Sequence, residues 1–365
     1  MNLFNFSGSI TNLKIWISGD PHLAQSVSQI DYNSISEPMQ DLEDINFNYD
    51  LALSIGDFGS EQAPPVQGDS EAGEQVSTAL NSQSNRNKIY TIPGNHDAGD
   101  GEFEWFERYI DIKGDNTAFS GVNNANRPFL ITYLNPSVWQ DGYYITIGNL
   151  LILMIPDRNE LPIQYGRGGL SVNGGYPSGA ITLNTWNLIK TFILANTDKN
   201  IFVCTHQNPR NTTIGTPDDD GVNGNFHSSN TGISAGAGSI YSIYDEGIPA
   251  NTDNATDEIL NFFSTNPTHS VSLWMAGHTH TYVGQTYNGK SHKFTSNGVQ
   301  FLNIAALTKT FVNTADIDSR SWTIEINNSN VNLKCYVHNP ETSGVIKGYR
   351  GDHEFDITLN RPFEI

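Results

Sequence analysis

The sequence predicts an α/β protein, and three observations support this fold class. The chain has 365 residues, enough for one large domain or two smaller ones with a sizeable core. Short apolar runs of strand length alternate along it with stretches of helical periodicity. Five of the apolar runs lead directly into Asp, Asn or His residues, which no helix or strand propensity requires. In open α/β sheets ligands bind at the carboxyl ends of strands, so we expect a functional site there.

The central motif follows the strand expected at 89–92. This run, Ile-Tyr-Thr-Ile, has the composition of a buried strand, and a Pro-Gly pair ends it. Asn95, His96 and Asp97 come next, side by side. An amide oxygen, an imidazole and a carboxylate at such a point suit a metal ligand, an acid catalyst and the residue that orients the acid.

Polar side chains follow four other expected strands in the same way, at 13–18, 51–55, 201–205 and 271–276. In chain order these side chains are Asp20 and His22, then Asp57, then His206, then His278 and His280. Mixed carboxylate, amide and imidazole groups suit divalent Mn, Fe, Zn, Co or Ni. No cysteine is among them, which argues against a closed structural zinc site.

The remaining elements are predicted from periodicity, capping and turn residues. Helices are expected over 36–49, 71–86, 102–110, 182–196 and 253–264. In the helix at 182–196, the expected apolar face consists of Leu183, Trp186, Ile189, Ile193 and Leu194. Residues 143–155 predict a β-hairpin with Gly148-Asn149 as its two-residue turn. A further strand is expected at 299–305, and residues 321–365 are β-like throughout.

The domain organisation follows from the absence of an internal repeat or a clear linker. We expect residues 1–310 to form one domain. Residues 207–252 would be an insertion in it, rich in Gly, Asn, Asp and Ser, at the rim of the active site. Residues 311–365 would form a β-rich C-terminal extension packed on the same domain. Residues 111–140 and 157–180 are expected to be irregular.

The charge of the chain restricts its partners. The net charge is −20, and no run of Lys and Arg is present, so binding to duplex nucleic acid is disfavoured. A small phosphorylated substrate remains compatible with this charge, because bound metal ions can reverse the local field. The oligomeric state is left open by these observations.

The compartment is only weakly indicated. The first residues lack the pattern of a signal peptide, and no apolar stretch approaches the ~18 residues of a membrane span, so a cytoplasmic protein is the default. Few Lys and Arg with many Asn, Gly and Ser also fit an extracellular or virion-associated protein. Cys204 and Cys335, both in expected strands, are read as core thiols. His269, His292, His338 and His353 are read as ordinary surface or satisfied histidines.

Five blocks in order carry a family resemblance. They are Asp20-Pro-His22, Gly56-Asp57, Gly94-Asn-His-Asp97, His206 and Gly277-His-Thr-His280, and they span roughly residues 15 to 280. This pattern resembles the calcineurin-like metallophosphoesterase family. The resemblance implies a four-layer αββα double β-sandwich. It also implies that Asp20, His22, Asp57 and His280 hold one divalent ion. Asn95, His206 and His278 would hold a second ion, with Asp57 bridging both and manganese as the preferred metal.

The same resemblance implies a mechanism. A hydroxide that bridges two metal ions would attack phosphorus, His96 would protonate the leaving oxygen as general acid, and Asp97 would support His96. Arg210 and His227 are candidate substrate contacts. Phe58-Gly59-Ser60 follows Asp57, so the chain lacks the tyrosine ligand of purple acid phosphatases three residues past that aspartate.

Three functions are therefore open at this stage. The first is hydrolysis of a phosphodiester or phosphomonoester of a small molecule such as a nucleotide. The second is a nuclease of the same family. The third is a non-catalytic or virion-associated binding protein on this fold, which would be expected to have lost ligands or the acid.

Overall fold

The computed structural model describes most, but not all, of the chain. The described residues are 12–22, 35–58, 86–94, 97, 106–114, 122, 124–156, 180–209, 211–214, 242–244, 258–280, 284, 286, 289–304, 306–307, 319–340 and 345–365. Residues 71–85 of the helix expected at 71–86, residues 157–179 and most of the insertion at 207–252 therefore lie outside the described residues.

Among the described residues, one mixed sheet has six strands in the order β15-β14-β13-β1-β2-β3. The strands are β1 (Asn12–Ser18), β2 (Leu51–Ile55), β3 (Ile89–Ile92), β13 (Ser319–Asn327), β14 (Asn330–Asn339) and β15 (Gly348–Thr358). Strands β1, β2 and β3 run parallel to one another, and β13 pairs with β1 antiparallel, with Ile15 opposite Ile324. The C-terminal strands thus extend the sheet that begins the chain. The domain boundary at residue 310 stays a prediction.

In the part of the chain that the structure describes, the second sheet has seven strands in the order β11-β12-β10-β8-β6-β5-β4. The strands are β4 (Ile131–Tyr133), β5 (Tyr143–Ile147), β6 (Leu150–Ile155), β8 (Asn200–Thr205), β10 (Val271–Ala276), β11 (Lys293–Ser296) and β12 (Val299–Asn303). Four central strands, β6, β8, β10 and β12, are parallel. A separate pair consists of β7 (Ala180–Thr182) and β9 (Ser242–Tyr244).

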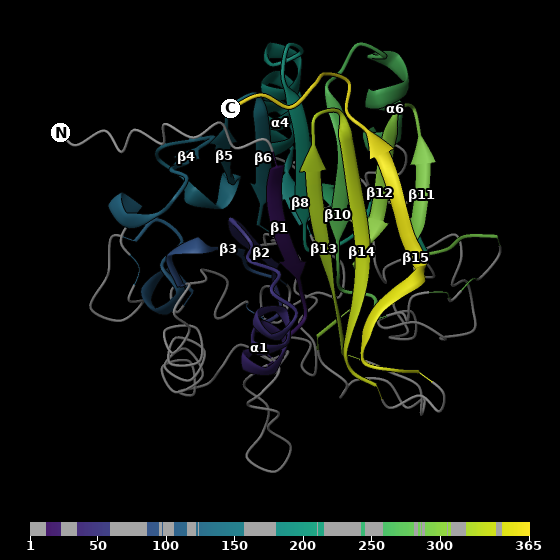
Figure 1. Ribbon diagram of the computed structural model, residues 1–365. Coiled ribbons are helices and arrows are strands. Elements are labelled where there is room, and N and C mark those ends of the chain that lie inside the picture. Colours follow the sequence, from purple (N-terminus) through teal and green to yellow (C-terminus); the bar gives the residue numbers. More distant parts are fainter. Residues whose placement is uncertain are drawn as a thin grey trace, which may run out of the picture.

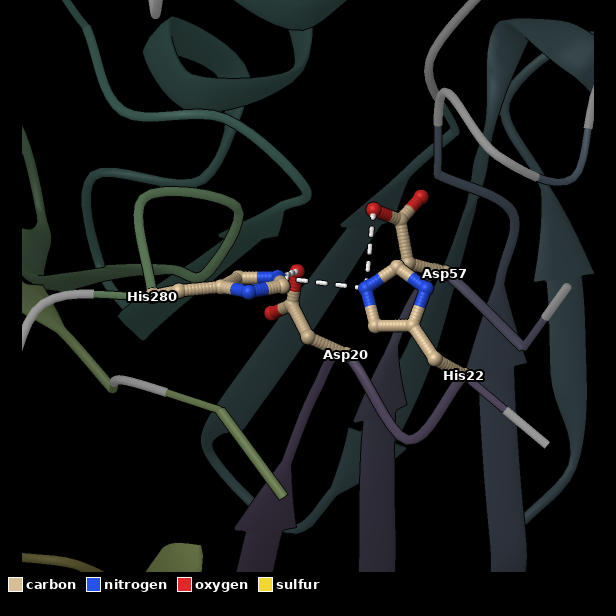
Figure 2. Close-up of side chains that lie close together, drawn as sticks. All are labelled: Asp20, His22, Asp57 and His280. Atoms are coloured by element: carbon tan, nitrogen blue, oxygen red, sulfur yellow. Dashed lines mark hydrogen bonds and ion pairs between the residues drawn. The ribbon is translucent and has the colours of Figure 1, made fainter. Parts of the chain in front are cut away.

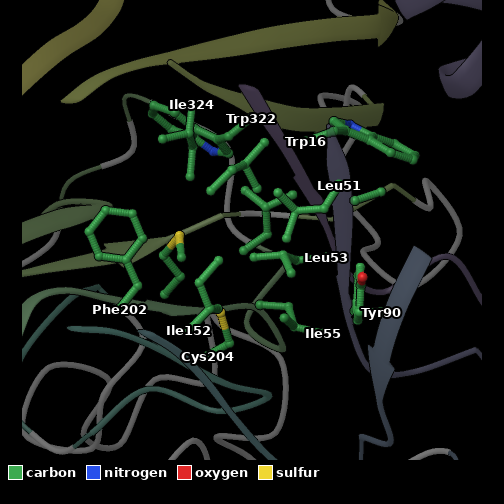
Figure 3. Packing of buried hydrophobic residues seen from close by; sticks show 14 of the residues in the cluster. Trp16, Leu51, Leu53, Ile55, Tyr90, Ile152, Phe202, Cys204, Trp322 and Ile324 are labelled. Atoms are coloured by element: carbon green, nitrogen blue, oxygen red, sulfur yellow. The ribbon is translucent and has the colours of Figure 1, made fainter. Parts of the chain in front are cut away.

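The two sheets pack face to face with helices outside them (Figure 1). Alternate residues of β8 divide between the two faces: Phe202 and Cys204 belong to the core between the sheets, and Ile201 and Val203 pack under the helices. Figure 3 shows Phe202 and Ile152 of one sheet close to Ile324 and Leu53 of the other. Helices α4 (Leu183–Ala195) and α6 (Glu258–Thr265) cover the second sheet, and α1 (Ser36–Asp44) lies against β14 of the first. The αββα prediction is therefore confirmed.

Several element predictions are confirmed and others need correction. The hairpin at 143–155 forms β5 and β6, with Gly148 in the left-handed region at φ 58°. The helix expected at 36–49 ends at Asp44, because Asn46 turns to φ 58° and the Phe47 amide bonds to the Leu42 carbonyl. The expected strand at 299–305 ends at Asn303. Strands β4 and β11 were not predicted.

The apolar face of α4 is narrower than expected. Trp186, Ile189 and Ile193 are buried, as predicted, but Leu183 and Leu194 are 39% and 45% exposed. Thr185 is buried instead, because its hydroxyl donates to Asp141 at 2.6 Å and its amide donates to the Thr182 side chain that caps the helix. The buried face of α4 therefore includes Thr185 and leaves out the two leucines.

The helix expected at 102–110 is only partly described. Its visible part, η3 (Phe106–Ile110), is a π-helical turn whose Phe106 and Ile110 are buried. Both cysteines are buried and neither is part of a disulfide, which confirms them as core thiols. None of the helices in the described ranges is long and apolar enough to cross a membrane.

A buried polar chain fastens α1 to the first sheet. His338 of β14 lies 2.9 Å from Asp41 through Nδ1, and its Nε2 lies 2.6 Å from the Ser321 hydroxyl. Lys347 pairs with the other Asp41 oxygen, and the Tyr336 ring packs against His338 at 4.8 Å. His338 is thus a satisfied histidine, as predicted. Ser321 has no exposed surface, so this chain of contacts has a structural role.

This chain of contacts makes folding stability sensitive to acid. Burial lowers the pKa of His338, and the contact with Asp41 opposes that effect without cancelling it. Burial alone would raise the pKa of Asp41, but the bonds from His338 and Lys347 outweigh it and the pKa lies below its usual value. The unfolded chain therefore binds more protons as pH falls below about 6.5 at His338 and below about 3.9 at Asp41, and the folded state loses stability in both windows.

We expect His338→Gln to weaken this pH dependence. The variant should lose less unfolding free energy than wild type between pH 7 and 5, by at most about 1.4 kcal/mol per pH unit, the limit for one proton. Urea unfolding at several pH values measures the difference in slope. The same slope in both proteins would contradict the assignment.

Candidate metal centre

The candidate site lies where the loops after four strands of both sheets converge. The loop after β1 supplies Asp20 and His22, and the loop after β2 supplies Asp57. The loops after β8 and β10 supply the remaining three histidines, His206, His278 and His280. Backbone bonds tie the loops together: the Asp20 amide donates to Gly56, and the Gly277 amide donates to His206. All six side chains are at most 3% exposed.

Four of these side chains form one tight group, shown in Figure 2. His22 Nε2 lies 3.1 Å from His280 Nε2, and His280 Nε2 lies 3.0 Å from Asp20 Oδ1. Asp57 Oδ2 is 3.8 Å from His22 Nε2. The ligand atoms of Asp20, His22, Asp57 and His280 all lie within 4.8 Å of one another.

A second group shares Asp57 with the first. It consists of Asp57, His206 and His278, again within 4.8 Å. His206 Nε2 lies 3.1 Å from Asp57 Oδ2, and its other nitrogen, Nδ1, lies 2.8 Å from the Ile55 carbonyl. Because that carbonyl can only accept, Nδ1 carries a proton, and Nε2 is the ring nitrogen that faces the Asp57 carboxylate. An imidazole nitrogen and a carboxylate oxygen at this distance can bind one cation together.

The spacing of these atoms fits metal coordination. Ligand atoms about 2.1 Å from one ion at angles of about 90–110° lie about 3.0–3.4 Å apart. The separations His22–His280, His280–Asp20 and His206–Asp57 are 3.1, 3.0 and 3.1 Å. Two carboxylates and four imidazoles buried together would otherwise carry a large desolvation penalty. The residues present therefore fit a pair of divalent ions.

Backbone strain is concentrated in the same loops. Five of the six residues have positive φ: Asp20 (54°), His22 (44°), Asp57 (59°), His278 (67°) and His280 (49°). Residues other than glycine seldom adopt this conformation, which costs about 1–3 kcal/mol each unless the surroundings enforce it. Such outliers gather at functional sites, so they are a second indication, independent of the distances.

Asp97 joins the strand β3 to this centre. Its Oδ2 accepts hydrogen bonds from the Gly94 and Asp57 amides, both at 2.8 Å, and the side chain has no exposed surface. One carboxylate oxygen thus fixes the end of β3 against the end of β2. Asn95, His96, Arg210 and His227, which the sequence also singles out, lie outside the described residues, and their roles stay predictions.

Two glycines allow the strand ends to approach this closely. A Cβ on Gly94 would overlap Asp57 Oδ1 and would lie 2.7 Å from the Asp57 amide and 2.8 Å from His206 Cε1. A Cβ on Gly56 would lie 2.6 Å from the Gly94 amide. No side chain fits between the two turns without moving a metal-ligand residue.

We expect Gly94→Ala to reduce the unfolding free energy by about 1–3 kcal/mol, the usual cost of overpacking. It should also weaken metal binding, because Asp57 and His206 must move. Gly351→Ala is the matched control, since its Cβ would meet nothing within 4 Å. Calorimetry with and without added Mn²⁺ measures both effects. A metal-induced rise in Tm equal to that of wild type would contradict the expectation.

The fold and the site can now be compared with known proteins. A family model described as calcineurin-like phosphoesterase matches residues 13–282, well over half of the chain. This chain belongs to the calcineurin-like phosphoesterase family. Family membership supports a phosphoester hydrolase, and it agrees with the resemblance seen in the five sequence blocks. No curated protein matches the chain.

Solved structures resemble this chain at low sequence identity. A dimetal phosphatase from Danio rerio is 10% identical with a TM-score of 0.51, covering 95% of this chain and 99% of its own. GAP50, the anchor in the inner membrane complex of Plasmodium, is 13% identical with a TM-score of 0.47, covering 97% and 90%. The protein TT1561 of Thermus thermophilus is 11% identical with a TM-score of 0.41, covering 86% and 94%. At these identities the likeness concerns the fold.

Sequence reasoning missed contacts that support the site. The Ile55 carbonyl, which fixes the tautomer of His206, has no sequence signal because any residue supplies a carbonyl. The amide of His278, which donates to Asp20 at 3.0 Å, has none either. Arg86 and Arg127 were not singled out from the sequence either. The position of Arg86, directly before the predicted strand that leads into the site, was a weak signal of a supporting role.

Proposed function

We propose that this protein hydrolyses a phosphodiester or phosphomonoester of a small molecule, such as a nucleotide, with two divalent metal ions. The observation that carries the proposal is the pair of buried ligand groups that share Asp57. Asp20, His22, Asp57 and His280 would hold one ion, and His206, His278 and Asn95 would hold the other with Asp57. The ligand types suit Mn, Fe, Zn, Co or Ni, and we take manganese as the first choice.

Bound ions would supply Lewis acidity towards the phosphoryl oxygens and would make water nucleophilic near neutral pH. The protein's own groups would bind the ions and supply the proton. Asp57 and Asp20 would offer carboxylate oxygens to the ions, and the Ile55 carbonyl holds His206 in the tautomer that offers Nε2. His96 would donate a proton to the leaving oxygen. Asp97, held by two amides, would anchor the turn that carries His96.

The test is a metal assay of the purified protein beside turnover of p-nitrophenyl phosphate and bis(p-nitrophenyl) phosphate with added Mn²⁺. We expect about two ions per chain and turnover of at least one ester. Faster turnover of the diester would identify a phosphodiesterase, and faster turnover of the monoester a phosphatase. Two bound ions without turnover of either ester would overturn the enzymatic proposal and favour a binding protein on this fold.

A further inference from the structure

Two buried arginines lie beside the strand that leads into the candidate metal centre. Arg86 belongs to η1 (Arg86–Lys88), directly before β3, and Arg127 follows η4 (Asn124–Asn126). Each residue is 5% exposed. Within the described ranges neither forms an ion pair with an acid, although the charge of Asp111 favours both cations. Their burial therefore needs an explanation other than a salt bridge.

The guanidinium groups bond to backbone carbonyls of two separate segments. Arg127 Nη1 donates to the Ile89 carbonyl at 2.7 Å, and its Nη2 donates to the Ile112 carbonyl at 2.8 Å. Arg86 Nη2 donates to the Ile110 carbonyl at 2.7 Å, with a longer contact of 3.4 Å from Nη1 to Ile89. Each arginine thus joins β3 to the segment that ends the π-helical turn η3.

One of the bonded carbonyls, that of Ile89, belongs to an edge strand of a sheet. Within the described ranges, β3 is the last strand of its sheet and pairs only with β2. Alternate residues of a parallel strand turn their carbonyls to the same side, and on the side away from β2 these are Ile89 and Thr91. The Ile89 carbonyl accepts from the arginines, and the Thr91 carbonyl accepts from the Tyr143 hydroxyl at 2.7 Å. Side chains thus supply the donors that a neighbouring strand would have supplied.

The arrangement is electrostatically unfavourable, and local contacts offset part of the penalty. Burial, followed by the like charge of Arg127, lowers the pKa of Arg86 to about 9, and burial also lowers the pKa of Arg127. Both remain cations at neutral pH. The Arg127 guanidinium carbon lies 4.6 Å from the centre of the Tyr90 ring, a cation–π distance. The Tyr90 hydroxyl in turn donates to the Phe129 carbonyl at 2.6 Å.

We propose that Arg86 and Arg127 are positioning residues. They give β3 hydrogen bonds that a neighbouring strand would otherwise give, and they thereby hold in place the contact between the Asp97 carboxylate and the Asp57 amide. Gly94 and Asp97 follow β3 within five residues, and Asp97 Oδ2 accepts from the amides of both Gly94 and Asp57. A shift of β3 along its free edge would therefore separate Asp97 from Asp57, a residue of both ligand groups. Lysine would not substitute fully, because a single ammonium lacks the planar fork that spans two carbonyls.

The experiment compares Arg127→Met with Lys88→Met in the full chain loaded with Mn²⁺. Lys88 is the control, since it is a cation of the η1 turn, directly before β3, that also donates to a backbone carbonyl, that of Tyr49, at 2.9 Å. Amide hydrogen exchange at Gly94 and Asp57 is measured in each protein. We expect exchange at both amides to be about tenfold faster in Arg127→Met and unchanged in Lys88→Met, because local opening is controlled by local contacts. Wild-type exchange at both amides in Arg127→Met would overturn the proposal.

A kinetic comparison separates positioning from stability alone, and this comparison rests on the proposed function. On p-nitrophenyl esters we expect Arg127→Met to lower kcat about 10- to 100-fold with KM changed less than about threefold, measured well below its Tm. A kcat equal to wild type in a folded Arg127→Met would overturn the positioning role.

If neither the wild type nor any variant hydrolyses an ester, the proposed function fails, while the exchange result still decides the role of the arginines. If Arg127→Met does not fold, Arg127→Lys takes its place: faster exchange at Gly94 supports the proposal and wild-type exchange overturns it.

Discussion

Replacing Asp57 by asparagine is expected to lower kcat/KM for aryl phosphates about 10³-fold, which corresponds to the several kcal/mol that metal ions contribute to a phosphoryl-transfer transition state. Bound metal should fall from about two ions to one or none. The reason is that Asp57 belongs to both ligand groups, with Oδ2 at 3.1 Å from His206 and 3.8 Å from His22. An asparagine offers a single neutral oxygen and cannot bridge two cations.

Metal analysis and turnover on the same samples measure both effects. Asp50→Asn is the matched control, because Asp50 stands before the first residue of β2 and Asp57 follows the last. The Asp50 carboxylate accepts from the Lys14 amide at 2.8 Å, which an asparagine oxygen can also do. Two bound ions and unchanged kinetics in Asp57→Asn would remove the basis of the dinuclear proposal.

The second large effect is expected from His96→Asn. This variant should keep both metal ions and lower kcat about 10²–10⁴-fold, the usual contribution of general acid catalysis. The loss should be smaller for an ester whose leaving group is a weak base, because such a group departs without a proton. Plotting log kcat against the pKa of the leaving alcohol for wild type and variant measures this difference.

His353→Asn provides the comparison for that experiment. His353 lies on β15 against His292, at a ring separation of 5.5 Å, and it belongs to neither ligand group. The His353→Asn variant should hydrolyse the substrate with the kcat of wild type. A His96→Asn protein with wild-type kcat and the same leaving-group dependence would refute the acid role of His96.

Much of the fold was predictable because local sequence controls it. The strands β1, β2, β3, β8 and β10 were placed to within one residue, since each is a short apolar run that polar residues terminate. The hairpin β5–β6 followed from its two turn residues. The face of α4 was predicted only in part, because the bond from Thr185 to Asp141 joins residues 44 positions apart. No periodicity in the helix itself records that partner.

By itself the sequence determined which side chains end the strands, and therefore which chemistry is available: three aspartates and four histidines among the described candidates, each within five residues of a strand end. Only the tertiary structure decided how they meet. Packing of one sheet on the other brings Asp20 beside His280, 260 residues away, and packing of α1 on β14 brings Asp41 beside His338, 297 residues away. Strand pairing leaves β3 at the edge of its sheet among the described strands, where Arg127 bonds to Ile89, 38 residues away. Such contacts depend on which strands become neighbours, and that is a property of the packed sheets rather than of any local run of residues.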